Sequence, residues 1–312
     1  MKSYVVTVTL NPALDKTVIV HNLEVGGLNR VQSMRIDPGG KGINVARVLN
    51  KFGVSVKATG LIAGSLGQVL LQYLDSVKIN ADFLTIPGET RTNLKIVDGS
   101  STITTEINEA GFAVGKTKMN AFKDKLSILL NEASYLVLSG SLPPQAASSI
   151  YRQFTEIATA KGVKTILDAD DKALCEGIQA APFAIKPNIH ELEKLAGYKM
   201  ADDKDIIRAA RGILEKGIEI IIVSMGAQGA IIMDKQTAYR VRTGAIVPKS
   251  TVGAGDSMVA VLIYSLLSKH SLAQTAQWVT AAGTVTASKP GTQVCSLEEV
   301  KQFLNQVQVE KI

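Results

Sequence analysis

The stretch Thr251-Val252-Gly253-Ala254-Gly255-Asp256-Ser257-Met258-Val259 decides how the chain folds around its site. Two glycines with one small residue between them allow backbone N–H groups to converge on an anion without obstruction by side chains. The apolar run that follows, Met258–Leu267, predicts a buried helix. Because a helix N-terminus carries unpaired N–H groups and the positive end of the dipole, we expect a phosphate group to bind here.

Asp256 is the unusual member of this stretch, because a carboxylate beside a phosphate site repels the phosphate. Its presence is explained if it accepts a proton from an attacking hydroxyl group, the role of the base in phosphoryl transfer. A helix cap after a glycine turn explains an isolated Gly-x-Gly-Asp equally well. The rest of the chain has to decide between the two interpretations.

Working outward, apolar strands alternate with helical segments, most plainly after residue 120. The pattern predicts strands at 4–10, 57–62, 83–86, 135–138, 164–167, 183–185, 219–223, 230–233 and 238–241. It predicts helices from the glycine cluster 39–42 to Gly53 and at 69–74, 121–130, 145–160, 206–214, 256–268, 272–288 and 297–306. This order favours an α/β fold with a mostly parallel sheet covered by helices on both faces.

Two insertions interrupt the alternation. Residues 16–21, 31–36, 93–97 and 102–107 have β character without following helices, and Asp98-Gly99 is a hairpin signal. Together they predict a small four-stranded sheet from insertions at about 12–37 and 88–109, which we interpret as a lid over a site. Its free edges make a homodimer through the lid a further expectation.

Composition restricts the class of protein. Of 312 residues, 46% are hydrophobic and 20% charged, which suits a large globular core. The net charge of +6 is scattered, and aromatic residues make up 5%, so we expect no nucleic-acid partner. Two cysteines without metal-like spacing argue against disulfides and zinc. Lys2 leads into a short strand and the apolar runs are short, so we expect a cytoplasmic protein without membrane association.

Polar residues follow several predicted strands at their carboxyl ends, where open α/β sheets bind ligands. They are Asp15, Ser139–Ser141, Lys186-Pro187-Asn188 and Ser224-Met225-Gly226. One such residue alone is more often a turn former than a ligand. Four sets at equivalent ends, with two glycine loops, indicate a binding site.

Two motifs in the right order identify a family. Thr251–Met258 resembles the C-terminal signature of the ribokinase-like (PfkB) sugar kinases, and Pro38-Gly39-Gly40-Lys41-Gly42-Ile43-Asn44-Val45-Ala46 resembles their N-terminal glycine signature. The similarity runs along the whole chain. Thr9–Asp15 and Ser139–Pro144 resemble the phosphosugar branch, which includes 1-phosphofructokinase, tagatose-6-phosphate kinase and the minor 6-phosphofructokinase.

The resemblance implies a single ribokinase-like domain over residues 1–312, a three-layer α/β/α sandwich with a small four-stranded β lid. It implies ATP- and Mg²⁺-dependent phosphorylation of a ketohexose phosphate. The first expectation is conversion of fructose 1-phosphate to fructose 1,6-bisphosphate, with tagatose-6-phosphate kinase and 6-phosphofructokinase as alternatives. A non-catalytic sugar-phosphate sensor on the same fold is the alternative from another class, although the intact Asp256 and Glu191 speak against it.

The resemblance also assigns roles by position. Catalysis falls to Asp256 with the loop Gly253, Ala254 and Gly255. Substrate binding falls to Asp15, Arg30, Gly39, Gly40, Lys41, Asn44, Arg91 and Ser139, with the arginines on the substrate phosphate. ATP binding falls to Lys186, Asn188, Ser224, Gly226, Gly229, Thr251, Gly253 and Gly255. In Asn188-Ile189-His190-Glu191, Glu191 places Mg²⁺. Taken alone, Arg30 and Arg91 would be surface charges and Glu191 a first-turn helix acid.

Two other patterns are rejected, and a third stays open. Gly111–Thr117 has three residues between its glycines where a Walker A loop needs four. Gly253–Met258 lacks the third glycine of a dinucleotide-binding fingerprint. The acidic residues Asp168, Asp170 and Asp171 could form a site, but a turn at the end of a strand explains them as well.

Overall fold

The computed structural model describes residues 3–101, 103–244 and 246–312. Its main sheet has ten strands among these residues, in the order β14-β13-β12-β11-β10-β9-β8-β1-β4-β5. They are β1 (Tyr4–Thr9), β4 (Val56–Ala63), β5 (Asn80–Ile86), β8 (Ala133–Ser139), β9 (Lys164–Asp168), β10 (Ala184–Ile185), β11 (Ile220–Ser224), β12 (Ala230–Met233), β13 (Ala238–Thr243) and β14 (Val307–Lys311). Neighbours from β5 to β11 pair in parallel, whereas β12, β13 and β14 are antiparallel.

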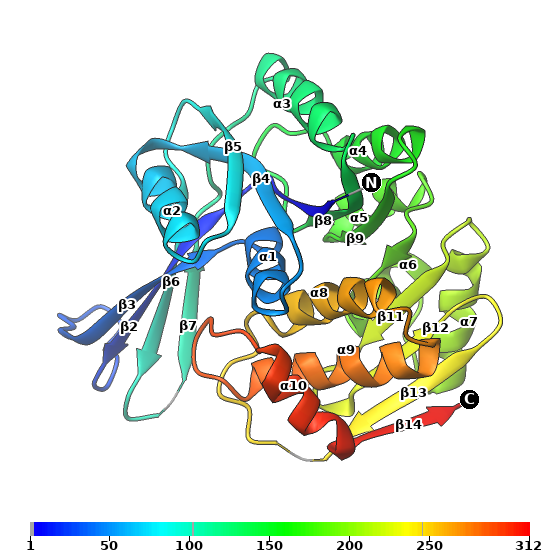
Figure 1. The fold of residues 1–312 in the computed structure, drawn as a ribbon. Coiled ribbons are helices and arrows are strands. Elements are labelled where there is room, and N and C mark those ends of the chain that lie inside the picture. Colours follow the sequence, from blue (N-terminus) through cyan, green and yellow to red (C-terminus); the bar gives the residue numbers. More distant parts are fainter. Residues whose placement is uncertain (1–2, 102, 245) are drawn as a thin grey trace.

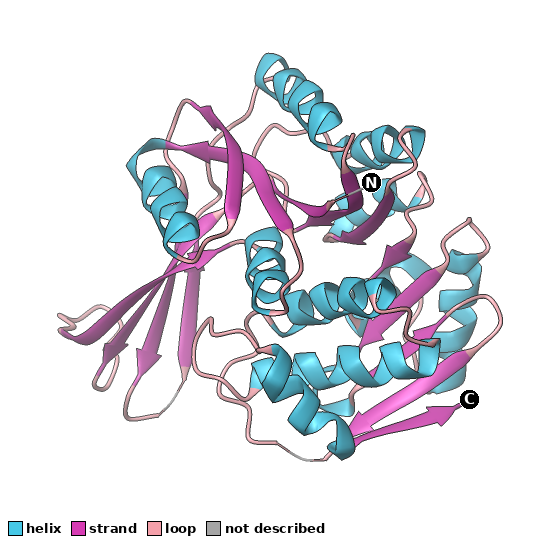
Figure 2. Ribbon diagram, in the orientation of Figure 1, coloured by secondary structure: helices cyan, strands magenta, loops and turns pink. Residues whose placement is uncertain are grey.

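Helices cover both faces of this sheet, as the ribbon views show (Figures 1 and 2). One face packs against α1 (Lys41–Lys51), α2 (Gly64–Ser76), α8 (Ala254–Leu267), α9 (Leu272–Ala287) and α10 (Leu297–Phe303). The other packs against α3 (Lys116–Leu129), α4 (Ile150–Ala160), α5 (Asp171–Ile178), α6 (Ile189–Ala196) and α7 (Asp203–Leu214). The predicted three-layer α/β/α fold is therefore confirmed.

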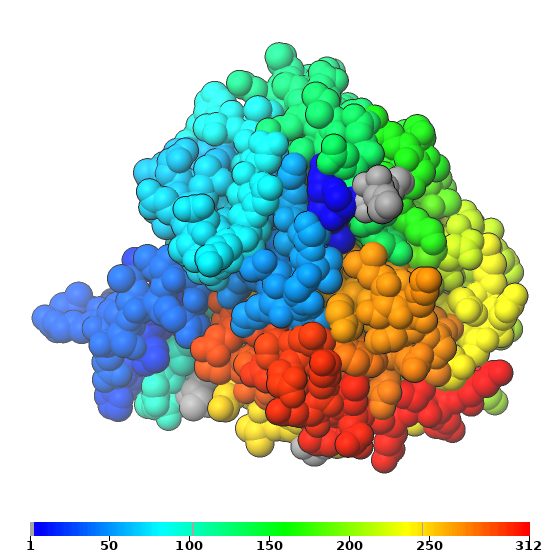
Figure 3. Space-filling model, viewed as in Figure 1, coloured from blue at the N-terminus to red at the C-terminus, as the bar shows by residue number. Residues whose placement is uncertain are grey.

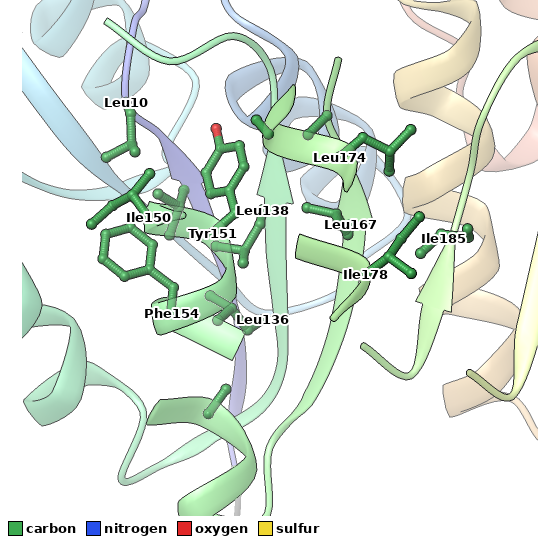
Figure 4. Packing of buried hydrophobic residues seen from close by; sticks show 14 of the residues in the cluster. Leu10, Leu136, Leu138, Ile150, Tyr151, Phe154, Leu167, Leu174, Ile178 and Ile185 are labelled. Carbon is green, nitrogen blue, oxygen red and sulfur yellow. The ribbon is translucent and has the colours of Figure 1, made fainter. Parts of the chain in front are cut away.

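Alternation along the strands produces these two cores. In β8, Leu136 and Leu138 point to the α3–α7 side, whereas Val137 between them points to the α1–α8 side. Figure 4 shows Tyr151 and Phe154 of α4 packed beside the two leucines. Strands buried on both faces need continuous apolar runs, which is what the sequence contains.

Several element boundaries differ from the predictions. The helix expected at 145–160 begins only at Ile150, because Gln145 has a left-handed φ of 66° after two prolines. The terminal helix expected at 297–306 is α10 followed by a 3₁₀ turn, and β14, which was not predicted, follows it and pairs with β13. Alternation in Val307–Lys311 was the available signal.

The two insertions form a second sheet that projects from the main body (Figures 1 and 3). It contains β2 (Ala13–Val20), β3 (Val31–Gly39), β6 (Arg91–Asp98) and β7 (Thr104–Asn108), in the order β3-β2-β6-β7. Asp15 thus lies inside β2 rather than in a turn after the first strand. Thr102, the expected first residue of the fourth strand, lies outside the described residues.

This small sheet has a polar face and an apolar face. The register pairs Asp15 with Asn93 and Lys95 with Glu106 on the polar face, which lines a cleft. On the other face, which we call the outer face, the exposed members include Met34, Ile36 and Ile107. Arg35 of β3 also lies against the loop after α9, since a Cβ built on Gly291 would be 1.4 Å from its Nη2. None of the described helices is both long and apolar enough to span a membrane.

Candidate active site

A cleft of about 990 Å³ opens where the parallel strands of the main sheet end and the small sheet begins. Strand ends supply Ser139, Asp168, Lys186, Asn188 and Ser224 to its wall. The polar face of the small sheet and the start of α1 supply Asp15, Arg91, Asn93, Lys95, Glu106, Gly40, Lys41 and Asn44. The cleft therefore lies at the carboxyl edge of the sheet, where open α/β sheets bind their ligands.

The glycine stretch forms a turn that ends in the first residues of α8. Gly253 has a left-handed φ of 79°, and the first intrahelical bond runs from the N–H of Ser257 to its carbonyl at 2.9 Å. The N–H of Ala254 donates to the Thr251 carbonyl at 3.3 Å. Both Gly255 and Asp256 line the cleft, and their N–H groups precede the first intrahelical bond, so these two groups are available to donate to an anion.

Asp256 is buried at this helix end, with 6% of its surface exposed. Nδ2 of Asn44 donates to its Oδ2 at 2.8 Å. Burial, with the negative charge of Asp168, raises the pKa of Asp256 to about 6, although Lys41, Asn44 and Lys186 act in the opposite direction. A carboxylate with this pKa is ionised at neutral pH and can still take up a proton.

Two lysines converge on Asp168. Its Oδ1 lies 3.5 Å from Nζ of Lys41 and 3.4 Å from Nζ of Lys186, and Lys41 also donates to Asp170 at 2.9 Å. Burial alone would raise the pKa of Asp168, but the two ammonium groups together lower it. Asp168 ends β9 and Asp170 precedes α5, so both stand at a turn after a strand, and both also lie in the cleft wall.

The carboxylates around Lys41 determine its charge state. Burial would lower its pKa, but the carboxylates of Asp168, Asp170 and Asp256 outweigh burial and raise it, so the ammonium stays charged. Its Nζ is directed to carboxylates of the cleft wall, and the role on the substrate phosphate remains a prediction.

The small sheet contributes the opposite end of the cleft. Nδ2 of Asn93 donates to Oδ1 of Asp15 at 2.9 Å, which joins β6 to β2. The guanidinium of Arg91 donates to the carbonyls of Asn11 at 3.2 Å and Glu109 at 3.0 Å. Nζ of Lys95 also lines the cleft and lies 3.9 Å from Glu106, a much looser pairing.

Asn93 and Lys95 were not named from the sequence. The signal was present in the alternation of β6, which puts residues 91, 93 and 95 on one face. It could be used only once the pairing with β2 was known, because a β pattern does not say which of its faces meets the site.

Most of the residues assigned from the sequence meet in this one cleft. They are Asp15, Gly40, Lys41, Asn44, Arg91, Ser139, Lys186, Asn188, Ser224, Gly226, Gly229, Thr251, Gly253, Ala254, Gly255 and Asp256. Three others do not line it. Arg30 is exposed in the loop before β3. Gly39 lies against the side chain of Asp15, since a Cβ built on Gly39 would be 2.8 Å from Oδ1 of Asp15. Glu191 lies in the first turn of α6.

The loops after β11 and before α8 form the remaining part of the cleft. Gly229 has a φ of 86°, and a Cβ there would lie 2.0 Å from the carbonyl oxygen of Val241, so only glycine fits. Small or apolar residues complete this wall, namely Ile246, Pro248, Val252, Gly283 and Ala287. Such a surface suits a flat heterocycle better than a sugar.

Glu191 forms a capping box with Asn188. Its Oε2 accepts from the N–H of Asn188 at 2.8 Å, and Oδ1 of Asn188 accepts from the N–H of Glu191 at 2.9 Å. Burial raises the pKa of Glu191, against the effect of the Asn188 N–H. The described residues contain no group of three or more potential metal ligands. One carboxylate plus phosphate oxygens is nevertheless a donor set that Mg²⁺ accepts.

Comparison with known proteins agrees with this geometry. A family model described as pfkB family carbohydrate kinase matches residues 8–299. The chain is 36% identical over 311 residues to 1-phosphofructokinase of Borreliella burgdorferi, covering 98% of each chain. It is 36% identical over 286 residues to 1-phosphofructokinase of Xanthomonas campestris, covering 90% of each. The structure of phosphofructokinase-2 from Escherichia coli in complex with substrates and products has a TM-score of 0.91 at 28% identity, covering 97% of this chain and 98% of that one.

Proposed function

The chain belongs to the pfkB family of carbohydrate kinases, and on that premise we propose that it transfers the γ-phosphoryl group of ATP to fructose 1-phosphate. The product would be fructose 1,6-bisphosphate. The observation that carries the proposal is the buried carboxylate of Asp256 beside the free N–H groups at the start of α8. The alternatives are phosphorylation of tagatose 6-phosphate or fructose 6-phosphate in the same cleft.

Asp256 acts as the base in this proposal. The 6-hydroxyl oxygen of the sugar bonds to the γ-phosphorus, the bond from that phosphorus to the β–γ bridging oxygen breaks, and the hydroxyl proton passes to Asp256. Because Asn44 occupies Oδ2, the proton goes to Oδ1. The N–H groups of Gly255 and Asp256 stabilise the charge on the transferred group.

The two ends of the cleft divide the substrates. ATP lies on the side of Ser224, Gly226 and Gly229, with its base against the small apolar wall and its phosphates toward Lys186 and α8. The sugar lies between Asp15 and Asp256, and its phosphate meets Arg91 and Lys95. The small sheet acts as a lid that excludes water from the transferred phosphoryl group.

Glu191 and the ATP phosphates would hold Mg²⁺. The ion would supply positive charge that offsets the charge of the phosphates. Lys186 adds to this from the protein side: it lines the cleft, and a Cβ built on Gly255 would be 3.1 Å from its Nζ. The absence of a side chain at Gly255 thus lets this ammonium approach the anion loop.

A homodimer through the outer face of the small sheet belongs to the same proposal. Met34, Ile36 and Ile107 are 55%, 51% and 54% exposed, although strand side chains of this kind are normally covered. A second copy would cover them while leaving the polar face to the cleft. Met34→Lys is expected to give monomers in sedimentation velocity. Ile128→Lys, which replaces a residue on α3 that is 70% exposed, is the control and should sediment like the wild type.

The proposed reaction is tested by a coupled assay of ADP release with fructose 1-phosphate, fructose 6-phosphate, tagatose 6-phosphate, fructose and ribose. We expect the highest kcat/KM for fructose 1-phosphate. A site with cations for a phosphate should disfavour free sugars by at least about 10³-fold. Preference for another phosphosugar would change only the substrate. Binding without turnover of any of these sugars would favour a sensor.

A cytoplasmic location fits these charged substrates and is part of the proposal.

A further inference from the structure

Arg47 lies one turn after Asn44 on α1 and contacts it directly. Nη1 of Arg47 donates to Oδ1 of Asn44 at 3.0 Å, and Nδ2 of Asn44 donates to Oδ2 of Asp256 at 2.8 Å. Residues three apart on a helix are neighbours on its surface, so the first bond is built into α1. The amide of Asn44 therefore lies between a guanidinium and the carboxylate of Asp256.

This arrangement allows the amide only one orientation. A guanidinium has donors and no acceptor, whereas an ionised carboxylate has acceptors and no donor. The oxygen of Asn44 must therefore face Arg47 and its NH₂ must face Asp256. With the amide turned over, its NH₂ would face the guanidinium and its oxygen the carboxylate, so both contacts would be lost.

Arg47 is itself held from two other parts of the chain. Nη1 donates to the carbonyl of Thr292, in the loop between α9 and α10, at 3.1 Å. Its Cζ lies 5.7 Å from the centre of the Tyr73 ring on α2. The contacts with the loop after α9 and with α2 hold the guanidinium in place, so it can in turn hold the amide of Asn44 in place.

We propose that Arg47 is a positioning residue for the reaction, which holds the amide of Asn44 with its NH₂ toward Asp256. The inference rests on the proposed role of Asp256 as the base. Neither Arg47 nor its contact with Thr292 lies in the cleft wall, so its effect passes through Asn44. Lys41, Asp168 and Lys186 are the other charged groups that act on Asp256, and none of them is bound to Arg47.

Loss of Arg47 should change the proton affinity of Asp256. When the amide of Asn44 is free to turn over, the carboxylate of Asp256 loses a donor and holds its proton more tightly. In Arg47→Met we expect the acid limb of the pH profile of kcat to move up by about one pH unit, a tenfold change in proton affinity. We expect kcat at neutral pH to fall by about 10- to 100-fold through misplacement of the base.

Lys51→Met is the matched control. Lys51 also lies on α1 and also binds the loop after α9, through a 3.1 Å bond from Nζ to the carbonyl of Val294. This control removes one cation and one contact to the loop but leaves the bond between Arg47 and Asn44. It should keep the wild-type pH profile. Equal shifts in the two variants would overturn the proposal, as would an unshifted profile in Arg47→Met.

Two further measurements keep the test independent of folding and turnover. Arg47→Lys keeps a donor-only cation and should shift the profile less than Arg47→Met. A ¹³C NMR titration of the Asp256 carboxyl in the folded protein without substrates should show the same upward shift in Arg47→Met. In an Asn44→Ala background, Arg47→Met should add no shift, and an additive shift would overturn the proposal. Absence of wild-type turnover with every sugar phosphate would instead reject the proposed function and leave the titration to decide the role of Arg47.

Discussion

Nζ of Lys186 lies 3.4 Å from Oδ1 of Asp168, and the two side chains are only 7% and 2% exposed. Lys41, from α1, reaches the same oxygen at 3.5 Å. One carboxylate therefore connects α1 with the strand end that bears Lys186. Two ammonium groups share this charge, so its removal leaves both without their buried partner.

Asp168→Asn is expected to lower the free energy of unfolding by about 3–5 kcal/mol, because it leaves the buried ammonium of Lys186 without its carboxylate partner. The pKa of Asp168 is lowered in the folded state, so its contribution is present above the unfolded pKa and is lost as the pH falls through the folded pKa. Urea denaturation at several pH values measures both effects. The difference from wild type should shrink below about pH 4.

The control for this prediction is Asp171→Asn. Asp171 pairs with Lys194 at 2.7 Å, but both side chains are about two-thirds exposed, at 67% and 68%. An exposed pair contributes about 0–1 kcal/mol. Equal losses in the two variants would show that burial does not determine the strength of the Asp168 interactions.

Asp256→Asn is expected to reduce kcat by at least about 10²-fold, the scale of a positioned base. Asparagine keeps the size of the side chain but cannot take the proton from the sugar. Calorimetry should show binding of ATP and fructose 1-phosphate close to wild type. Near-normal turnover by the purified variant would reject Asp256 as the base.

The pH profile of kcat should follow the ionisation of Asp256. Its pKa is raised to about 6, and only the ionised form accepts the proton, so kcat should increase with pH through about 6. Initial rates between pH 5 and pH 8 at saturating substrates measure this. The residual activity of Asp256→Asn should not rise with pH in this range. A rise that persists in the variant would show that another group causes the pH dependence of kcat.

The same substitution should stabilise the protein at neutral pH. The pKa of Asp256 is higher in the folded than in the unfolded state, so ionisation disfavours folding as the pH rises above the unfolded pKa. We expect Asp256→Asn to increase the free energy of unfolding by about 1–3 kcal/mol at pH 8. The gain should disappear near pH 4, where the wild-type carboxyl is protonated when folded. Destabilisation at pH 8 would contradict this.

Substitutions of Lys95 and Glu106 should change the KM for fructose 1-phosphate in opposite directions. Lys95→Met is expected to raise KM for fructose 1-phosphate by at least about tenfold, because a charged hydrogen-bond partner of the phosphate is lost. Glu106→Gln should lower that KM, since it removes a negative charge facing the same cleft. Steady-state kinetics with each substrate varied should show little change in KM for ATP. Lys118→Met, which replaces an exposed residue of α3, controls for net charge and should leave both constants unchanged.

Much of the fold could be predicted because most of its strands and helices are determined by residues close together in the chain. Apolar runs such as those of β8 and β11, separated by helical periodicity, indicate strands buried on both faces. The final strand β14 was not among the predicted elements, and of the short helix α6 only the first turn at Glu191 was expected. Such short elements carry few periodic positions, and their neighbours decide their conformation.

The sequence by itself determined the glycine turn before α8, the alternating α/β core and the two β insertions. Each depends on residues close together in the chain, as with the positive φ of Gly253 and the helix that follows it. Only the tertiary structure decided which side chains meet Asp256. Asn44 is 212 residues away from it, Asp168 and Lys95 reach the cleft through strand order and register, and Arg47 is linked to Asp256 through Asn44, its neighbour on α1. A side chain's chemistry can be read from its type, but its pKa and its partners depend on burial and distance, which only the packed chain defines.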